Sequence, residues 1–233
     1  MKDAQGYYDA FSTSYERERH RGYHAMIDRL ETEAIAPYIS VHGRVLEAGC
    51  GTGLILRRLG PRAVGADLSR GMLTKARARG LTVVQARVDA LPFRADAFDA
   101  ACSFKVLAHV PPIREALGEV ARVVRPGGHV ALEFYNKRSL RYLAFRLRRG
   151  HIANGTTEKD VFTRYDDVAA MHAYLPAALQ PVATRGIRVV TPLAALIRVP
   201  LLGRVLCAVE RWAARAPLFR ELGGFLLLIT RKG

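Results

Sequence analysis

Short apolar runs alternate with helical patterns between residues 44 and 135. One helical pattern keeps its apolar residues on a single face: Ile113, Leu117, Val120 and Val124. The apolar runs are short, which is typical of strands buried on both sides of a sheet. They are residues 44–49, 63–67, 81–87, 98–104 and 129–135. Strands that alternate with helices in this way predict crossover units and a parallel sheet.

Serine and glycine residues mark the ends of several predicted elements. Ser69 can cap a helix that runs to Gly80, which is a suitable residue just beyond a helix C-terminus. A second helix is predicted over residues 53–59, closed by Gly60. The sequence RPGG at residues 125–128 predicts a turn before the fifth strand.

The two ends of the chain carry other patterns. Residues 1–40 are polar and aromatic and follow a helical pattern. The last third predicts a basic amphipathic helix over 140–150, a helix over 165–179, a strand over 181–190, an apolar helical segment over 193–215 interrupted at Pro200, and a strand over 225–233. This final strand is so apolar that we expect it to be buried beside the strand before it.

The bulk properties point to a soluble, cytoplasmic protein. No apolar run approaches the length that spans a bilayer, and the N-terminal residues lack the apolar centre of a signal peptide. The 3 cysteines are far apart, which predicts a reducing compartment and no structural zinc. The net charge of +15 is compatible with nucleic acid, an anionic membrane surface or an acidic substrate, and also with a merely arginine-rich composition.

The stretch VLEAGCGTGLILRRLG, residues 45–60, has glycines at alternate positions between a strand and a helical pattern. Such a turn lets a ligand approach bare backbone N–H groups. A P-loop is excluded because Leu54 stands where its second glycine would be and no lysine follows. The dinucleotide fingerprint also fails at Leu54, since its third glycine is missing.

Two carboxylates narrow the choice of ligand. Glu47 directly precedes the glycines, where it would repel a pyrophosphate and favour a ligand with positive charge. Asp67 ends the second strand, where a carboxylate can accept hydrogen bonds from a ribose diol. S-adenosylmethionine has a ribose, no phosphate, and both a sulfonium and an ammonium group. The residues therefore predict S-adenosylmethionine as cofactor, with S-adenosylhomocysteine as its product.

Five further segments, in order, extend this prediction. They are YYDAFSTSYE near the N-terminus, VGADLS, VDALPF, FDAACSFKVLAHV and RVVRPGGHVAL. Together with VLEAGCGTG they resemble the motifs of the class I S-adenosylmethionine-dependent methyltransferases of small molecules, the family that includes the ubiquinone and menaquinone methyltransferases. The resemblance covers roughly residues 7–135 and fades beyond them.

The resemblance implies a role for each matching residue. Gly49, Cys50 and Gly51 would border the methionine part of the cofactor, and Glu47 would lie beside them. Asp67 would hold the ribose. Leu68, Met72 and Leu91 would pack at the adenine, Asp89 would accept from its amino group, and the Ala90 N–H would face it. Ser103 and Phe104 would lie near the sulfonium, and Tyr15 would close over the methionine.

The resemblance also completes the expected architecture. It implies an α/β fold with a doubly wound, mostly parallel, seven-stranded Rossmann-like sheet and helical lid elements at the N-terminus and in the last third. We expect a single methyltransferase domain over residues 1–233. Its parts would be an N-terminal helical cap (1–40), a cofactor-binding core (41–135), variable lid helices (136–220) with a core strand near 182–190, and a final strand (224–232).

His109 is the candidate catalytic residue, because it follows the fourth strand and could take a proton from an acceptor hydroxyl. A structural role is the alternative. Lys105 is interpreted as a solvated or positioning charge. His20 and His24 have metal-ligand spacing, but no third ligand is nearby, so no metal is expected.

The predicted activity is methyl transfer to a small-molecule acceptor, at an oxygen of a lipophilic or aromatic metabolite. Transfer to nitrogen or to carbon, including quinone-type C-methylation, stays open, as does a non-catalytic or RNA-associated cofactor-binding protein. Nucleic acid is not the expected acceptor, because SFKV replaces the D/N-P-P-Y/F motif after the fourth strand. Apolar residues over 193–212 and basic residues over 137–149 allow peripheral membrane contact or packing in a monomer or homodimer.

Overall fold

The protein is described from a computed structural model. The structure describes residues 4–13, 15, 22–40, 42–139, 142, 143, 146, 162–190 and 200–233. The predicted helix over 140–150 lies largely outside these residues. His20 and the first part of the apolar segment 193–215 lie outside them as well.

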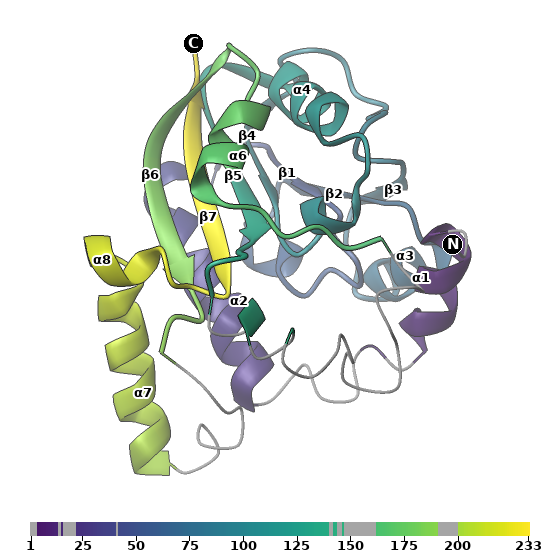
Figure 1. Ribbon diagram of the computed structural model, residues 1–233. Helices are drawn as coiled ribbons and strands as arrows, with labels where there is room; N and C mark the ends of the chain where they lie inside the picture. Colours follow the sequence, from purple (N-terminus) through teal and green to yellow (C-terminus); the bar gives the residue numbers. More distant parts are fainter. Residues whose placement is uncertain are drawn as a thin grey trace.

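A seven-stranded sheet runs through the middle of the molecule (Figure 1). Its strands are β1 (Val45–Ala48), β2 (Ala63–Asp67), β3 (Val83–Gln85), β4 (Phe98–Ser103), β5 (Val124–Tyr135), β6 (Leu179–Ile187) and β7 (Phe225–Lys232). They lie in the order β3-β2-β1-β4-β5-β7-β6. The first five strands pair in parallel, and β7 runs antiparallel to both β5 and β6. The predicted doubly wound, mostly parallel sheet is confirmed.

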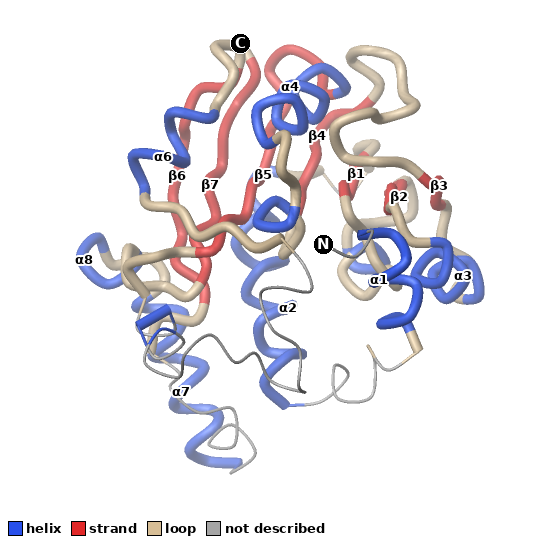
Figure 2. Tube along the Cα trace, turned by 45° about the vertical axis from the view of Figure 1, so that its right-hand side comes forward, coloured by secondary structure: helices blue, strands red, loops and turns tan. Residues whose placement is uncertain are grey.

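Helices cover both faces of this sheet (Figures 1 and 2). They are α1 (Ala4–Ser12), α2 (Gly22–Ile35), α3 (Arg70–Ala78), α4 (Ile113–Val123), α6 (Val168–Tyr174), α7 (Pro200–Ala213) and α8 (Pro217–Arg220). On one face α4 and α6 pack over residues such as Leu132 and Phe134. On the other face α2 and α3 pack over residues such as Val45 and Leu227. The alternation of strands and helices therefore builds two apolar layers around one sheet.

The final strand lies inside the sheet, as its composition predicts. Strand β7 is inserted between β5 and β6, and Leu226, Leu227, Leu228 and Ile229 are all at most 2% exposed. A strand with neighbours on both edges and helices on both faces has no solvated side. This explains why its apolar residues run consecutively instead of alternating with polar ones.

Local signals located the ends of α3 correctly. The Ser69 hydroxyl accepts a hydrogen bond from the Met72 N–H, which is the expected N-terminal cap. Gly80 has φ of +73°, the left-handed conformation that glycine adopts readily just after a helix. The sequence was therefore sufficient to define this helix without tertiary information.

Two predicted elements differ from the structure. The helix over residues 53–59 is only a 3-10 turn at Leu56–Arg58, where the Arg58 and Leu59 N–H groups donate to the carbonyls three residues before them, at Ile55 and Leu56. The turn over residues 125–128 falls within β5 as an irregularity. Pairing with β4 shifts there, from Val124 opposite Phe98 to His129 opposite Ala100.

The parallel strands bring several sequence motifs to one edge of the sheet. Strands β1, β2, β4 and β5 end at Ala48, Asp67, Ser103 and Tyr135, and the glycine turn follows β1. Ligands of open α/β sheets bind outside these carboxyl ends. Among the described residues, no helix combines the length and the apolar character needed to cross a bilayer.

Candidate functional site

The glycine turn after β1 adopts a conformation that only glycine accepts easily. Gly49, Gly51 and Gly53 have φ of +82°, +53° and +79°. A Cβ on Gly49 would lie 2.1 Å from the Cγ2 atom of Val106. The turn is tied to β2, because the Gly49 and Cys50 N–H groups both donate to the Ala66 carbonyl, at 2.7 and 3.0 Å. The turn is thus a cradle held against β2, with the half-buried Gly49 and Gly51 on either side of the buried Cys50.

Asp67 lies beside this cradle. One carboxylate oxygen accepts from the Gly51 N–H at 2.8 Å and the other from the Ser69 N–H at 2.9 Å. Burial raises the pKa of Asp67, and these two N–H groups partly oppose that rise. Each oxygen has a second lone pair. The carboxylate can therefore accept hydrogen bonds from a diol while still holding the turn.

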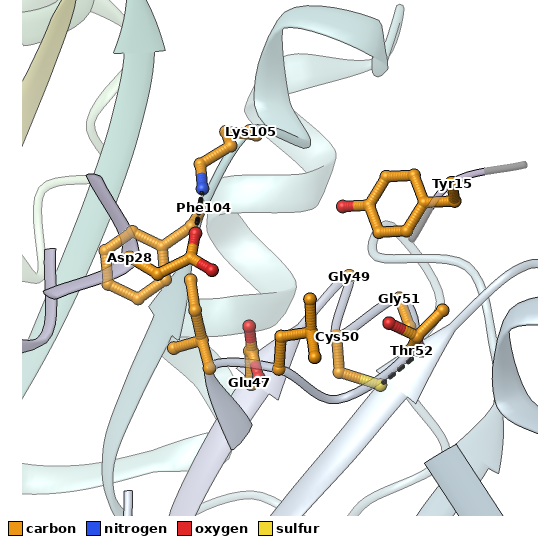
Figure 3. A pocket seen from close by; sticks show the side chains of 11 residues that line it. Tyr15, Asp28, Glu47, Gly49, Cys50, Gly51, Thr52, Phe104 and Lys105 are labelled. Atoms are coloured by element: carbon orange, nitrogen blue, oxygen red, sulfur yellow. Dashed lines mark hydrogen bonds and ion pairs between the residues drawn. The ribbon is translucent and has the colours of Figure 1, made fainter. Parts of the chain in front are cut away.

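A pocket opens between the glycine turn, the loop after β4 and helix α2 (Figure 3). Six residues predicted to bind the cofactor line it: Tyr15, Glu47, Gly49, Cys50, Gly51 and Phe104. Five further lining residues were not predicted as binding residues: Asp28, Thr52, Leu54, Ile55 and Lys105. Figure 3 shows the Tyr15 hydroxyl directed across the pocket above Gly49 and Gly51.

Lys105 lies half-buried among carboxylates on one wall of the pocket. Its ammonium lies 2.9 Å from an oxygen of Asp28 (Figure 3). It also lies 2.9 Å from an oxygen of Glu31, and both acids are on α2. Its backbone N–H donates to Glu133 of β5 at 2.9 Å. Lys105 has φ of +59°, an uncommon conformation for a residue with a side chain. The alternative of a solvated charge is therefore wrong, because the side chain is only 18% exposed and is held on several sides.

The carboxylates outnumber the ammonium in this cluster. Asp28, Glu31, Glu47 and Glu133 are each at most 3% exposed. Burial raises the pKa of Glu133 well above its usual range, and the nearby charge of Glu31 raises it further. Four acidic side chains therefore meet one ammonium in this cluster, which favours a positively charged ligand.

Glu47 forms the floor of the pocket beneath this cluster (Figure 3). Among the described residues, its Oε2 atom is buried and has no hydrogen-bond partner. Burial raises the pKa of Glu47 well above its usual range, although Lys105 opposes this. A buried carboxylate without a partner is unfavourable unless something binds to it. The observation agrees with the sequence-based expectation that Glu47 faces a cation.

The remaining predicted residues lie around the pocket and have partners within the protein. The Ser103 hydroxyl donates to the Ala48 carbonyl at 2.8 Å and is fully buried, so it joins β4 to β1 and does not line the pocket. Asp89 is held by Arg87 through two hydrogen bonds, at 2.9 and 2.6 Å. Its neighbours are engaged as well: the Ala90 N–H donates to the Arg87 carbonyl and the Leu91 N–H to Glu119.

Helix α1 lies against the N-terminus of α3, beside Asp67 (Figures 1 and 2). Asp9 accepts hydrogen bonds from the Ser69 hydroxyl at 2.6 Å and from the Gly71 N–H at 2.9 Å. These contacts lower the pKa of Asp9, with the Ser69 bond as the larger cause. The N-terminal cap is therefore attached at the ribose side of the candidate site, next to the predicted adenine residues Leu68 and Met72.

His109 lies in a 3-10 turn after β4, surrounded by aromatic rings. Its ring centroid is 6.2 Å from that of Tyr8 and 5.5 Å from that of Tyr135. Its Nδ1 atom is 2.9 Å from the Phe162 carbonyl oxygen. A carbonyl only accepts, so Nδ1 carries the hydrogen, and in the neutral ring Nε2 is the basic nitrogen.

The fold and the site together define a class: an α/β domain with a carboxylate at the end of β2, a glycine turn after β1 and a pocket lined in part by acidic side chains. Residues 46–132 match a family model described as a methyltransferase domain. The chain is 36% identical over 110 residues to a ubiquinone biosynthesis O-methyltransferase of Alkalilimnicola ehrlichii, covering 43% of this chain and 44% of that protein. It is 43% identical over 103 residues to a demethylmenaquinone methyltransferase of Thermus thermophilus, covering 39% and 47%.

A solved structure extends the likeness in fold to nearly the whole chain. It is an S-adenosylmethionine-dependent methyltransferase of Thermotoga maritima, with a TM-score of 0.70 at 18% identity, covering 98% of this chain and 99% of that one. The chain spans about half the length of the curated relatives it matches. These findings confirm the predicted resemblance: the chain has the cofactor-binding domain of the class I S-adenosylmethionine-dependent methyltransferases. S-adenosylmethionine is the cofactor of this class.

The raised pKa of Glu47 predicts a pH dependence of stability. In the unfolded chain Glu47 ionises at its ordinary pKa, whereas in the fold it keeps its proton to higher pH. The free energy of unfolding without cofactor should therefore fall as pH rises from the ordinary to the raised pKa. The slope attributable to Glu47 is at most about 1.4 kcal/mol per pH unit. Glu47→Gln should flatten this slope in urea denaturation.

Glu119→Gln is the matched control. Glu119 is bound by Arg122, which lowers its pKa, so this variant should leave the slope between about pH 5 and 7 unchanged. Equal slopes for wild type and Glu47→Gln would mean that Glu47 titrates normally.

Proposed function

We propose that this protein transfers a methyl group from S-adenosylmethionine to a small-molecule acceptor, at an oxygen of a lipophilic or aromatic metabolite. The observation that carries the proposal is the pocket itself. It joins the glycine turn to a buried oxygen of Glu47 that has no hydrogen-bond partner among the described residues, and Asp67 lies beside that turn, bound to the Gly51 N–H. A phosphate ligand would be repelled there, whereas an uncharged ribose attached to a cation is complementary to it.

Different residues of the chain would bind different parts of this cofactor. Asp67 would hold the ribose diol, and the glycine turn at Gly49, Cys50 and Gly51 would border the methionine part. Glu47 and the excess of carboxylates around Lys105 would stabilise the positive charges. Tyr15 and Phe104 would enclose the methionine part. At the adenine we assign Leu68, Met72, Asp89, Ala90 and Leu91.

Bound S-adenosylmethionine supplies a methyl group on a good leaving group, ready for in-line displacement. The protein therefore contributes mainly alignment and the exclusion of water. We assign His109 as the group that takes the proton from the acceptor. The Phe162 carbonyl binds Nδ1 of the ring, which leaves Nε2, on the other side of the ring, as the basic nitrogen. Methyl transfer to a hydroxyl releases one proton, which His109 would receive.

Aromatic side chains support the choice of acceptor. The half-buried Tyr135 ring lies near the half-buried rings of His109 and Tyr165, whose centroids are 5.5 and 5.6 Å from its own. Such a surface suits an acceptor with aromatic or hydrocarbon area, since burial of apolar surface is the main source of its affinity. The likeness to a ubiquinone O-methyltransferase agrees with oxygen as the target. Transfer to carbon is the second candidate, supported by the likeness to a demethylmenaquinone methyltransferase.

Asp67→Asn tests the cofactor assignment. The substitution keeps the size of the side chain but removes its charge and one acceptor. We expect S-adenosylhomocysteine to bind about tenfold to hundredfold more weakly, which corresponds to the loss of one charge-assisted hydrogen bond. Calorimetric titration measures this. Asp99→Asn is the control, because Asp99 lies at the other end of the strands, where it binds Arg125 and the Arg44 N–H. Unchanged affinity in Asp67→Asn would refute its role.

A methylation screen tests the acceptor class. Neutral aromatic, anionic aromatic and polar sugar acceptors are offered with S-adenosylmethionine, and release of S-adenosylhomocysteine is measured. We expect turnover with the aromatic acceptors, and mass spectrometry of the product then distinguishes O-methylation from C-methylation. Turnover confined to small polar acceptors would contradict the proposal.

His109→Gln tests the proton transfer once an acceptor is known. A general base contributes about a hundredfold to ten-thousandfold in rate, so kcat should fall while the KM for the acceptor changes little. The wild-type rate should decline on the acid side as the imidazole becomes protonated, and the variant should lack this decline. A variant with the wild-type pH profile would show that His109 has only a structural role.

A further inference from the structure

Helices α7 and α8 carry an apolar surface that the described part of the chain leaves exposed. The α7–α8 patch consists of Leu202, Val205, Val209, Trp212, Leu218, Phe219 and Leu222, which are between 38% and 85% exposed. The ring centroids of Trp212 and Phe219 lie 5.3 Å apart, so the patch is continuous between the two helices. Contiguous apolar surface of this kind marks an interaction site in a soluble domain.

The exposed residues of α7 form a stripe along one side of the helix. Leu202, Val205, Val209 and Trp212 fall within an arc of about 80° at 100° per residue. The sequence pattern alone would place such a stripe against the core. In the structure it is directed outward, and α7 and α8 stand at the β6 side of the molecule (Figures 1 and 2).

A buried carboxylate fixes this orientation. Glu210 is fully buried, and its two oxygens accept hydrogen bonds from the N–H groups of Val189 and Val190, just beyond β6. Ala213 is also fully buried on the inner side of α7. The helix is therefore attached to the sheet by a polar contact on one side, and its apolar stripe remains available on another.

The exposed charges on and just after α7 are all positive. Arg204, Arg211 and Arg215 are exposed, and the acidic residue of α7, Glu210, is buried. Arg211 also lies 3.7 Å from Glu33, in an exposed ion pair of small energetic weight. Two copies of this surface facing each other would bring arginines together, whereas anionic headgroups would be complementary. Exposed apolar residues do not favour RNA.

We propose that the α7–α8 patch binds the surface of an anionic phospholipid bilayer. The apolar side chains would enter the boundary between headgroups and acyl chains, and the arginines would reach the phosphates. Trp212 suits this boundary because its ring is apolar and its N–H is polar. The patch shares no residue with the cofactor pocket, so the proposal does not depend on the reaction.

Trp212 provides a direct readout, because it is the only tryptophan in the sequence. The intact protein is mixed with vesicles of phosphatidylcholine alone, or with vesicles in which part of it is replaced by phosphatidylglycerol. We expect a blue shift of the tryptophan emission and co-sedimentation with the anionic vesicles only. Absence of both with the anionic vesicles would overturn the proposal.

Matched charge variants distinguish vesicle binding through the α7–α8 patch from binding through the overall basic charge of the protein. Arg204→Gln with Arg215→Gln removes two charges at the patch. Arg58→Gln with Arg77→Gln removes two exposed charges elsewhere. Arg77 is on α3, which lies near the β3 edge of the sheet, whereas α7 lies near the β6 edge (Figure 1). Each charge near an anionic surface is worth about fivefold in affinity, so the first pair should weaken binding about thirtyfold. The second pair should leave it nearly unchanged, and equal losses would overturn the assignment to this surface.

An apolar variant completes the test. Leu218 is 85% exposed, so Leu218→Gln should keep the fold while weakening vesicle binding. Two further outcomes would overturn the proposal. One is a blue-shifted emission without lipid that grows with protein concentration together with a dimer in analytical ultracentrifugation, since a second copy would then cover the patch. The other is retention of added RNA that is abolished by Leu218→Gln.

Discussion

The contact of the half-buried Lys105 with buried carboxylates is the constraint on which the candidate site depends. Removing charges from water costs several kcal/mol per ion, and only close opposite charges and hydrogen bonds recover this cost. Lys105 provides them by contacting Asp28 and Glu31 of α2 through its ammonium and Glu133 of β5 through its N–H. These contacts hold α2 against the carboxyl ends of the strands. They therefore fix the wall of the pocket opposite the glycine turn.

Several features of the site lower the stability of the protein when no ligand is bound. Gly49 and Gly51 adopt left-handed conformations, and Lys105 does so with a side chain attached. Burial raises the pKa of Glu47, whose Oε2 atom has no partner within the described residues. Strain and unsatisfied polar groups persist in proteins where the surroundings enforce them, and they cluster at binding sites. A cationic ligand would relieve the electrostatic part of this cost.

Carboxylates that bind backbone N–H groups attach two peripheral helices to the core. Asp9 of α1 binds the Gly71 N–H at the start of α3, and Glu210 of α7 binds the N–H groups of Val189 and Val190. Because polar contacts carry much of the attachment, the apolar residues of α7 are not all needed for packing. This explains how a strongly apolar helix can present a stripe to its surroundings.

The sequence by itself determined the sheet, the glycine turn and the carboxylate at the end of β2, because these depend on local periodicity, on backbone conformation and on the position of Asp67 at a strand end. It did not reveal that Asp28, Glu31, Glu133 and Lys105 meet, although an acid within the apolar run of β5 and two acids among the buried positions of α2 were visible signals. Their meeting depends on contacts between residues up to 105 positions apart, from Asp28 to Glu133, which no local pattern encodes. The tertiary structure likewise decided that the α7 stripe faces outward, since an amphipathic pattern specifies that a face is apolar but not what covers it.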